Sequence, residues 1–457
     1  MNTTTIHISN IIDSQRIDVS YFKETSGTDR FVPLSKYVEV KGGKRIPKGE
    51  SFSFENTNYL YLRLSEITDP YNIDYTALKN ISEDLFNTLH RYEITNNQVV
   101  FSIAGTIGRV FTIKNIPQGK RVILTENCAK LQPKDGKILP DFISILLGCD
   151  FVQQQIGQNR IKTTIPKIGL DRIAKLKVPE LPSLKKQQEI VDIYSNTQKE
   201  RLKKKREAEQ LLDGIDDYLL DSLKINNTLD SEIGSSFNIP FSRIINNRLD
   251  VSFYKNKFEM ISTVYRNEKL SSIVEIDPTI SFKEREADEI ISFIPMESID
   301  EEYGEIAYSH ETIVAESKGY TKFEDGDLLW AKITPCMQNG KSAIARGLKH
   351  GVGCGSTEFF VLRPQNINDV LIDYVYLILR HHKVLESAQS SFGGSAGQQR
   401  VSKQYLKNLM IPLPDASIQK EMVDKVVSMK TKAKCLQKEG NRLMEDTKRK
   451  IENMILG

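Results

Sequence analysis

Long apolar runs and cysteine pairs are both missing from this 457-residue sequence. No stretch approaches the ~18 consecutive apolar residues that a membrane-spanning helix requires, so no membrane association is expected. The five cysteines are scattered and form no Cys-x-x-Cys pair, which argues against a disulfide framework and against a structural zinc site. The first residues also lack the basic and apolar regions of a signal peptide. Together these absences predict a cytoplasmic protein.

The sequence also lacks the short motifs that mark many enzyme active sites. It contains no G-x-x-x-x-G-K-[ST], no H-E-x-x-H and no G-x-S-x-G. Its six histidines are dispersed except for the neighbours His381 and His382. We expect these two to point to different faces of one helix and to have structural or solvent-exposed roles. We therefore predict a chain that is not an enzyme, with no catalytic residues and no metal site.

Charge of neither sign dominates. The chain has 63 lysines and arginines against 60 acidic residues, for a net charge of +3. This balance excludes a protein that binds nucleic acid through bulk positive charge, as histones do. Any nucleic-acid surface must therefore be local, formed by particular loops rather than by the chain as a whole.

The chain is a tandem repeat. The block Arg16–Phe22 returns as Arg248–Tyr254, 232 positions later, and Glu189–Asp192 returns as Glu421–Asp424 at the same offset. Six such blocks keep nearly one offset, which is close to half the length of the chain. Coincidence explains this poorly, so the sequence predicts two homologous halves.

Each half ends in a long proline-free segment with helical periodicity. Along Ile190–Tyr218 and Met422–Lys450, positions that step by 4-3-4-3 form an imperfect heptad seam. This stripe is longer than one small domain could cover, which favours antiparallel pairing of the two helices over packing of each helix on its own globular region. The first seam is polar at Arg201 and Lys204, whose long side chains could pass a small residue such as Ala433.

Both halves have the same internal order: a mixed region, a Pro-x-Pro stretch and then the long helix. The mixed regions contain short β-like runs between Gly, Pro and Asn breaks. We predict an α+β fold with two mixed α/β domains in tandem repeat, separated by two long antiparallel coiled-coil helices around a pseudo-twofold axis. The expected limits are 1–182 and 224–415 for the domains, and 183–223 and 416–457 for the helices.

Two stretches in each half carry basic and amide side chains but no acidic residue. These acid-free windows are 94–125 and 151–170 in the first half, and 328–357 and 387–414 in the second. Glu126 and Glu358 follow the first window of each half at the same repeat position. Lysine and arginine neutralise phosphates, arginine pairs with guanine, and glutamine or asparagine pairs with adenine. One such window would more often be a solvated loop, but recurrence in both repeats favours DNA binding.

A further basic stretch, Lys41–Gly49, occurs only in the first half; the equivalent place in the second half reads Asp277–Lys283. The halves thus keep a scaffold and differ in their loops, as expected if each reads a different sequence. The candidate DNA-contacting residues are Lys44, Arg45, Lys48, Thr106, Arg109, Lys120, Arg121, Gln158, Arg160, Lys162, Lys332, Thr334, Gln338, Asn339, Lys341, Gln398, Gln399 and Arg400.

These features resemble the DNA specificity subunit of type I restriction–modification systems. Residues Arg400–Pro414, which lead into Ile418–Met422, are similar to that family, and Ile165–Pro182 is a weaker copy. Lys44–Lys48 and Val99–Gly108 are also similar. The resemblance spans the whole chain, and the order and duplication of the short motifs make it specific.

The resemblance implies that each mixed domain is a target-recognition domain, which reads one half of a bipartite site on double-stranded DNA. It implies that the helices set the unspecific gap and dock two methyltransferase (M) subunits, which hold S-adenosylmethionine. A restriction (R) subunit, a motor and nuclease that uses ATP and Mg, can join them. No cofactor is expected in this chain itself.

The second half departs from the family pattern at Ile333–Gly340, which is several residues longer than Gly105–Gly108. Two other classes of function stay open. One is the specificity subunit of another methylation-based phage-defence system or of a two-subunit methylating endonuclease. The other is a non-catalytic scaffold whose paired domains bind protein.

Overall fold

The computed structural model describes residues 31–67, 73–159, 166–225, 260–393 and 398–457. The repeat blocks Arg16–Phe22 and Arg248–Tyr254 lie outside these ranges. The chain divides into two compact units: unit 1 is Met1–Lys204 with Lys438–Gly457, and unit 2 is Lys205–Gln437. Because this division cuts through both long helices, it does not test the predicted domain limits, which stay a prediction.

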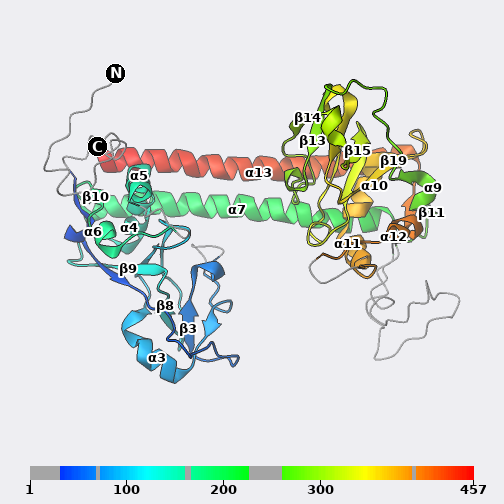
Figure 1. Ribbon diagram of the computed structural model, residues 1–457. Coiled ribbons are helices and arrows are strands. Elements are labelled where there is room, and N and C mark those ends of the chain that lie inside the picture. Colours follow the sequence, from blue (N-terminus) through cyan, green and yellow to red (C-terminus); the bar gives the residue numbers. More distant parts are fainter. Residues whose placement is uncertain (1–30, 68–72, 160–165, 226–259, 394–397) are drawn as a thin grey trace, which may run out of the picture. The chain divides into compact units, whose positions relative to one another are not determined.

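Unit 1 contains two four-stranded sheets with short helices beside them (Figure 1). In the second sheet the two central strands run parallel, and the other pairings are antiparallel. The first sheet has the order β2 (Val38–Gly42), β9 (Cys128–Pro133), β6 (Val99–Ser102), β7 (Val110–Thr112); the second has the order β4 (Lys79–Asn80), β3 (Tyr59–Leu62), β8 (Arg121–Leu124), β5 (Glu93–Ile94). The helices are α3 (Glu83–Leu89), α4 (Pro140–Leu147), α5 (Asp150–Gln158) and α6 (Leu170–Ala174), and a short pair joins β1 (Val32–Pro33) to β10 (Lys177–Val178).

The strand β6 shows why its sequence is apolar without a break. Successive side chains of a strand point to opposite faces. Val99 and Phe101 pack in the cluster that contains residues of α4 and α5, whereas Val100 packs in the cluster shared with the second sheet. Since β6 is covered on both faces, the alternation of polar and apolar residues that marks a half-exposed strand is lost.

Unit 2 repeats this topology strand for strand, which confirms the tandem repeat. Its second sheet again has two parallel central strands. The sheets are β12 (Val274–Ile276), β19 (Phe359–Pro364), β16 (Leu328–Ala331), β17 (Ser342–Ile344), and β14 (His310–Ile313), β13 (Ile290–Ile294), β18 (Val352–Gly355), β15 (Thr321–Glu324). The pair β11 (Arg266–Lys269) and β20 (Met410–Leu413) matches β1 and β10, and the helices are α9 (Leu270–Ile273), α10 (Ile372–Arg380), α11 (His382–Gln389) and α12 (Lys403–Asn408).

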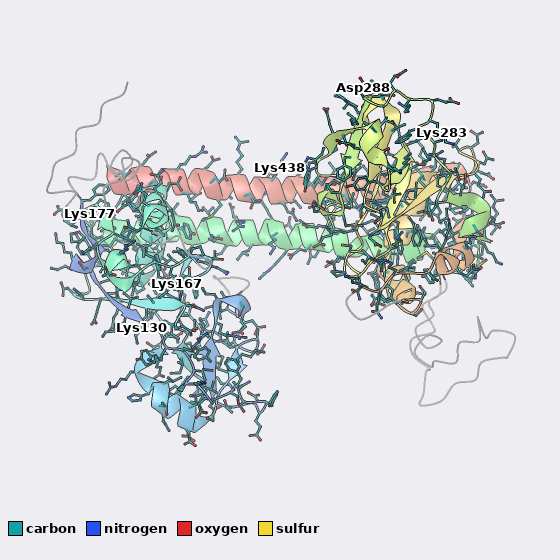
Figure 2. All side chains as sticks on the ribbon, in the orientation of Figure 1. Lys130, Lys167, Lys177, Lys283, Asp288 and Lys438 are labelled. Carbon is teal, nitrogen blue, oxygen red and sulfur yellow. The ribbon has the colours of Figure 1, made fainter. Side chains whose placement is uncertain are left out.

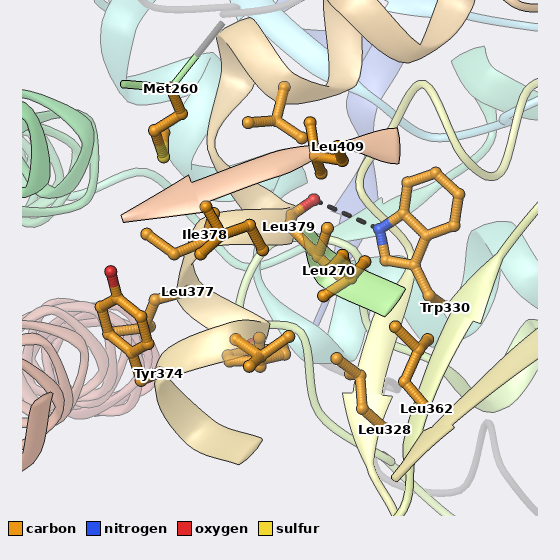
Figure 3. Packing of buried hydrophobic residues seen from close by; sticks show 14 of the residues in the cluster. Met260, Leu270, Leu328, Trp330, Leu362, Tyr374, Leu377, Ile378, Leu379 and Leu409 are labelled. Carbon is orange, nitrogen blue, oxygen red and sulfur yellow. Dashed lines mark hydrogen bonds between the residues drawn. The ribbon is translucent and has the colours of Figure 1, made fainter. Parts of the chain in front are cut away.

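The core of unit 2 is centred on Trp330 in β16 (Figure 3). Its ring is buried among aliphatic side chains of the sheet and of α10. The indole nitrogen donates to the Leu379 carbonyl at 3.2 Å, so the polar atom of the largest core side chain is satisfied. This contact fixes the end of α10 against the sheet.

The two long helices are α7 (Leu184–Ser222) and α13 (Ala416–Leu456), which confirms the helical segments expected from the heptad pattern. They lie side by side and antiparallel in each unit (Figure 1). In unit 1 the Oγ1 atoms of Thr197 and Thr447 are 3.1 Å apart in a buried contact. In unit 2 Ala208 and Ala433 are both buried in one small cluster. The predicted antiparallel pairing is therefore present.

The polar centre of the seam is packed differently from the prediction. Ala433 shares its cluster with Ala208, so it is not the small residue beside Arg201. That residue is Gly440, where an added Cβ would lie 3.4 Å from Cγ of Arg201. Lys204 extends to Glu439, with Nζ 2.7 Å from the carboxylate. The aliphatic part of the Arg201 side chain packs over Gly440, while the ammonium group of Lys204 reaches Glu439 at the edge of the helix pair.

A buried glutamine in the first turn of each long helix ties that helix to its domain. Gln187 accepts from the Leu139 N–H at 2.9 Å and donates to the carbonyls of Lys137 and Pro182, both at 2.9 Å. Gln419, which is 232 residues later, accepts from the Leu371 N–H at 2.9 Å. It donates to the carbonyls of Asp369 and Pro414, both at 2.8 Å. Both side chains are fully buried, and these three bonds satisfy both polar atoms of each amide.

Within the ranges that the structure describes, no helix combines the length and the apolar character needed to span a bilayer. Even the 39-residue α7 and the 41-residue α13 carry polar and charged residues throughout.

Replacing Gln187 with alanine should destabilise the protein by ~2 kcal/mol or more, because each buried backbone group left without its partner costs about 1–3 kcal/mol. Gln188→Ala removes an exposed amide one position along the same helix and should change stability by only ~0.5 kcal/mol. Urea denaturation of both variants measures the difference. Equal destabilisation by the two changes would show that the buried hydrogen bonds do not stabilise this junction.

Candidate nucleic-acid interface

The basic stretch Lys41–Gly49 of the first half passes close to the backbone between β8 and β9, at a point where only glycine fits. Gly43 donates its N–H to the Cys128 carbonyl at 2.9 Å. A Cβ on Gly43 would lie 2.0 Å from the Thr125 carbonyl oxygen, so any larger residue would move the loop away. This close approach brings Arg45 to Glu126, with Nε 3.1 Å from Oε1.

Glu126 has several partners besides Arg45. Its Oε2 accepts from the Thr125 hydroxyl at 2.9 Å. The Tyr61 hydroxyl shares its one proton between the Lys44 carbonyl at 2.7 Å and Oε2 of Glu126 at 3.2 Å. Burial raises the pKa of Tyr61 to about 12, so this phenol is a hydrogen-bond donor at neutral pH. The carboxylate that follows the first acid-free window is thereby held by three groups of the same domain.

Glu358 occupies the equivalent place in the second half and is also paired with an arginine. Arg400 binds it in a bidentate manner, with Nη2–Oε1 and Nε–Oε2 distances of 2.7 and 2.9 Å. The hydrogen bonds from Arg400 lower the pKa of Glu358. In both halves the acid at the edge of the basic window is thus neutralised by an arginine from another loop. Repulsion between this acid and a nearby phosphate is reduced accordingly.

The fold brings together the two acid-free windows of the second half. The Thr334 N–H donates to the Gln399 carbonyl at 2.9 Å, and the Gln399 N–H donates to the Thr334 hydroxyl at 3.2 Å. Two residues after Gln399, the Val401 N–H donates to the Lys332 carbonyl at 2.9 Å. These bonds place the candidate residues of both windows on adjacent backbone segments.

The windows of the first half meet in the same way. The Gly105 N–H donates to the Pro166 carbonyl at 3.2 Å, and the Ile168 N–H donates to the Ile103 carbonyl at 3.0 Å. Ala104 forms an isolated bridge between the two segments with Lys167, which Figure 2 labels. The exposed Thr106 lies two residues beyond this junction. Arg160 and Lys162, which belong to the second window, lie outside the described residues.

Arg109 and Lys341 are at equivalent positions and both hold a neighbouring turn. The Arg109 guanidinium donates to the Ile67 carbonyl at 2.7 Å. The Lys341 ammonium donates to the Met296 carbonyl at 3.4 Å. Both acceptors belong to the turn that follows the parallel strand β3 or β13. These two candidate cations therefore already contribute to the internal structure of their domains.

Other candidates also have partners within the domain. Arg121 binds Glu93 with two hydrogen bonds of 2.8 and 2.6 Å and lies 4.3 Å from the ring centroid of Phe86. The Lys120 ammonium donates to the Asn56 side chain at 2.9 Å. In the second half the Gln338 amide contacts Gln389 at 3.3 Å, the Asn339 amide contacts Glu301 at 3.1 Å, and the Lys332 ammonium lies 5.4 Å from the ring centroid of Phe360.

Lys44, Lys48 and Gln398 are exposed, and Gln158 is half-buried at the end of α5. The exposed groups can reach a ligand without first breaking a buried contact. All the candidates remain predictions for DNA contact.

Sequence reasoning missed the side chains that shape the first-half loop. Ser102 is buried; its hydroxyl donates to the Thr106 carbonyl at 2.5 Å and accepts from the Arg109 N–H at 2.8 Å. This one hydroxyl closes the loop that presents Thr106. A serine at the end of an apolar strand gives no distinct signal in a single sequence, because its role depends on the turn that follows.

The prediction that His381 and His382 point to different faces of one helix was wrong. His381 lies between α10 and α11, and its ring stacks on that of His382 with centroids 5.0 Å apart. His382 Nδ1 is 2.6 Å from the carboxylate of Asp216. These three residues could approach one metal ion. However, His381 Nδ1 accepts from the Lys383 N–H, which leaves the proton of the neutral ring on Nε2, where it opposes coordination.

The Arg400–Glu358 pair predicts a pH dependence. Because the folded-state pKa of Glu358 is lowered, its ion pair with Arg400 stabilises the folded protein fully above the ordinary glutamate pKa of 4.5. It is lost as the pH falls through the folded-state pKa. Glu358→Gln should therefore melt at a lower temperature than the parent at pH 7, and the difference should narrow below pH 4.5. Glu386→Gln, at an exposed position of α11, is the control. A difference that stays constant with pH would contradict the ionic contribution.

The sequence matches the family described as type I restriction modification DNA specificity domain, over residues 31–213 and 265–443. It is 40% identical over 159 residues to the EcoAI type I restriction enzyme specificity subunit of Escherichia coli, and 38% identical over 158 residues to the EcoEI specificity subunit of the same organism. Each match covers 34% of this chain and 26% of the relative, so the chain matches about a quarter of the length of these proteins.

A chain from a solved structure, described as showing complex assembly and conformational transition of the type I R-M system, shares the fold. The identity is 14% and the TM-score is 0.50, with 93% of this chain and 96% of that chain covered.

Proposed function

The chain belongs to the type I restriction–modification DNA specificity family, and on this basis we propose that it is the sequence-specific DNA-recognition subunit of such a system. One observation of the structure supports this most directly. In each unit the acid-free windows adjoin, and the carboxylate beside them is neutralised by an arginine, Arg45 in one half and Arg400 in the other. A cationic, amide-rich surface of this kind suits phosphate contact together with base readout.

Each mixed domain is proposed to read one half of a bipartite site on double-stranded DNA. The shared strand order supports a common mode of docking, since the sheets of the two units correspond strand by strand. The loops differ: only the first half has the basic stretch Lys44–Lys48, whereas the longer loop of the second half contains Gln338 and Asn339. Different loops on one scaffold are what two different half-sites require.

Chemistry is proposed to reside on partner subunits. This chain would position two methyltransferase subunits, which hold S-adenosylmethionine, and would join a motor–nuclease subunit that uses ATP and Mg. The sequence supports this division, because none of the catalytic motifs sought above occurs in it. The purified chain alone is accordingly expected to transfer no methyl group and to cut no DNA.

Replacing Lys48 with alanine should weaken DNA binding uniformly across sequences and lower the salt slope by about 0.9 for each phosphate that is no longer neutralised. Gln398→Ala should instead reduce discrimination at one base pair by roughly 1–3 kcal/mol and leave the salt slope unchanged. The measurement is affinity of the complex reconstituted with its methyltransferase partner, against cognate and single-mismatch duplexes at several salt concentrations.

Lys432→Ala is the matched control for these variants, since Lys432 is an exposed lysine on α13 outside every acid-free window. It should alter neither property. If Lys48→Ala and Gln398→Ala also leave affinity and sequence preference unchanged, these residues do not contact DNA. If the parent complex binds all duplexes equally, the proposed recognition function is wrong.

The helix pair is proposed to set the gap between the two half-sites. Four residues inserted after Lys204 add ~6 Å, close to one helical turn. The seam therefore still faces the partner helix, and the heptad pattern is interrupted only by a four-residue insertion, a stutter. Because Lys204 pairs with Glu439 of the antiparallel helix, the sharper variant also inserts four residues between Gln437 and Lys438. This double insertion should lengthen the recognised gap by one or two base pairs at ~3.4 Å each, with unchanged half-sites.

Methylated positions mapped by sequencing DNA from cells that express the variant complex provide the readout. A control with the same four residues inserted between Asn366 and Ile367, in an exposed loop of unit 2, should leave the gap as it is. Altered half-sites with an unaltered gap would mean that the helices do not act as the spacer.

A further inference from the structure

Phe54 is exposed to an unusual degree for an aromatic residue. Its relative exposure is 107%, and among the large apolar side chains of the described residues the next highest value is 75%, at Ile367. Single exposed apolar residues are common on protein surfaces and need no explanation by themselves. The setting of Phe54 is what distinguishes it.

The backbone on both sides of Phe54 is held in place. On one side the Ser53 N–H donates to the Asn80 carbonyl at 2.8 Å, and on the other the Thr57 N–H donates to the Asn80 side chain at 3.1 Å. Within the turn, the Ser53 hydroxyl accepts from the Glu55 N–H at 3.1 Å. The turn therefore presents Phe54 from a fixed support on β4, which lowers the conformational entropy that a binding contact must overcome.

The residues two positions before and after Phe54 both contact cationic groups. The guanidinium of Arg63 lies 5.0 Å from the ring centroid of Phe52. The Lys120 ammonium donates to Asn56 at 2.9 Å. The same loop, from the close approach at Gly43 onwards, contains three basic candidates of the first half, Lys44, Arg45 and Lys48. An exposed phenyl ring thus lies in a loop that also carries three of the groups expected to contact phosphate.

The second unit lacks this arrangement. Its corresponding loop, between β12 and β13, contains Phe282, which is only 4% exposed. Lys322 lies 4.5 Å and Arg285 6.0 Å from the centroid of that ring. Phe282 also packs in a small cluster with Ile291, Val352 and Cys354. The loop of unit 1 thus has Phe52 packed beside a cation and Phe54 exposed in addition, whereas the phenylalanine of the unit 2 loop is buried.

We propose that Phe54 makes an apolar contact with a base of the DNA half-site read by unit 1, an inference that rests on the recognition function proposed above. Phenylalanine side chains contact thymine methyl groups and base faces, and can enter between base steps. The neighbouring Glu55 cannot neutralise a phosphate, so any favourable contact of its carboxylate with DNA would be with a base edge. A carboxylate in a groove can accept from the cytosine amino group.

The test compares Phe54→Ala with Ile367→Ala, an exposed apolar residue on a loop of unit 2 that contains no candidate contact. In the complex reconstituted with the methyltransferase partner, Phe54→Ala should weaken cognate DNA binding about tenfold, the order expected for a base–aromatic contact. The salt slope should not change, since the substitution leaves every phosphate-binding group in place. Ile367→Ala should bind as the parent does.

Single-base substitutions then locate the contact. The variant should lose discrimination at one or two base pairs of the unit 1 half-site and keep full discrimination at the other half-site. Phe54→Leu should retain part of the affinity. Normal binding and discrimination by Phe54→Ala would overturn the inference, as would failure of this variant to assemble with the methyltransferase, which would assign the ring to a protein interface. If the parent complex itself shows no sequence preference, the recognition function fails instead.

Discussion

The buried glutamine at the start of each long helix is the contact on which the rest of the structure depends. Gln187 and Gln419 each join three backbone groups of the preceding domain to the first turn of a helix. A buried amide that lost one of these partners would destabilise the fold, so the geometry has little freedom. The junction between each mixed domain and the helix that follows it is therefore rigid.

Electrostatic neutralisation shapes the candidate interface as much as positive charge does. Glu126 and Glu358 lie at the edge of the basic windows, where an unpaired carboxylate would repel a phosphate. Arg45, which precedes Glu126 in the sequence, and Arg400, which follows Glu358, pair with these carboxylates and reduce that repulsion. The two halves thus reach the same electrostatic arrangement on a shared scaffold with different loops.

Much of the fold could be predicted from the sequence, because its signals are local and repeated. A heptad pattern over about four heptads predicted α7 and α13, and apolar runs between Gly and Pro breaks predicted strands such as β6 and β16. The candidate site was less accessible. Arg109 and Lys341 belong to the basic windows by composition, yet each holds a turn after a distant strand. No spacing in the sequence indicates such a contact.

The sequence by itself determined the tandem repeat, the paired long helices and the family, since each rests on periodicity, offset or short motifs. The tertiary structure decided which side chains meet. It placed Gly440 rather than Ala433 beside Arg201, stacked His381 on His382 at a helix corner, and exposed Phe54 while covering Phe282. These outcomes depend on which backbone segments approach one another, and hydrophobic pattern specifies the face of an element but not its partner across the fold.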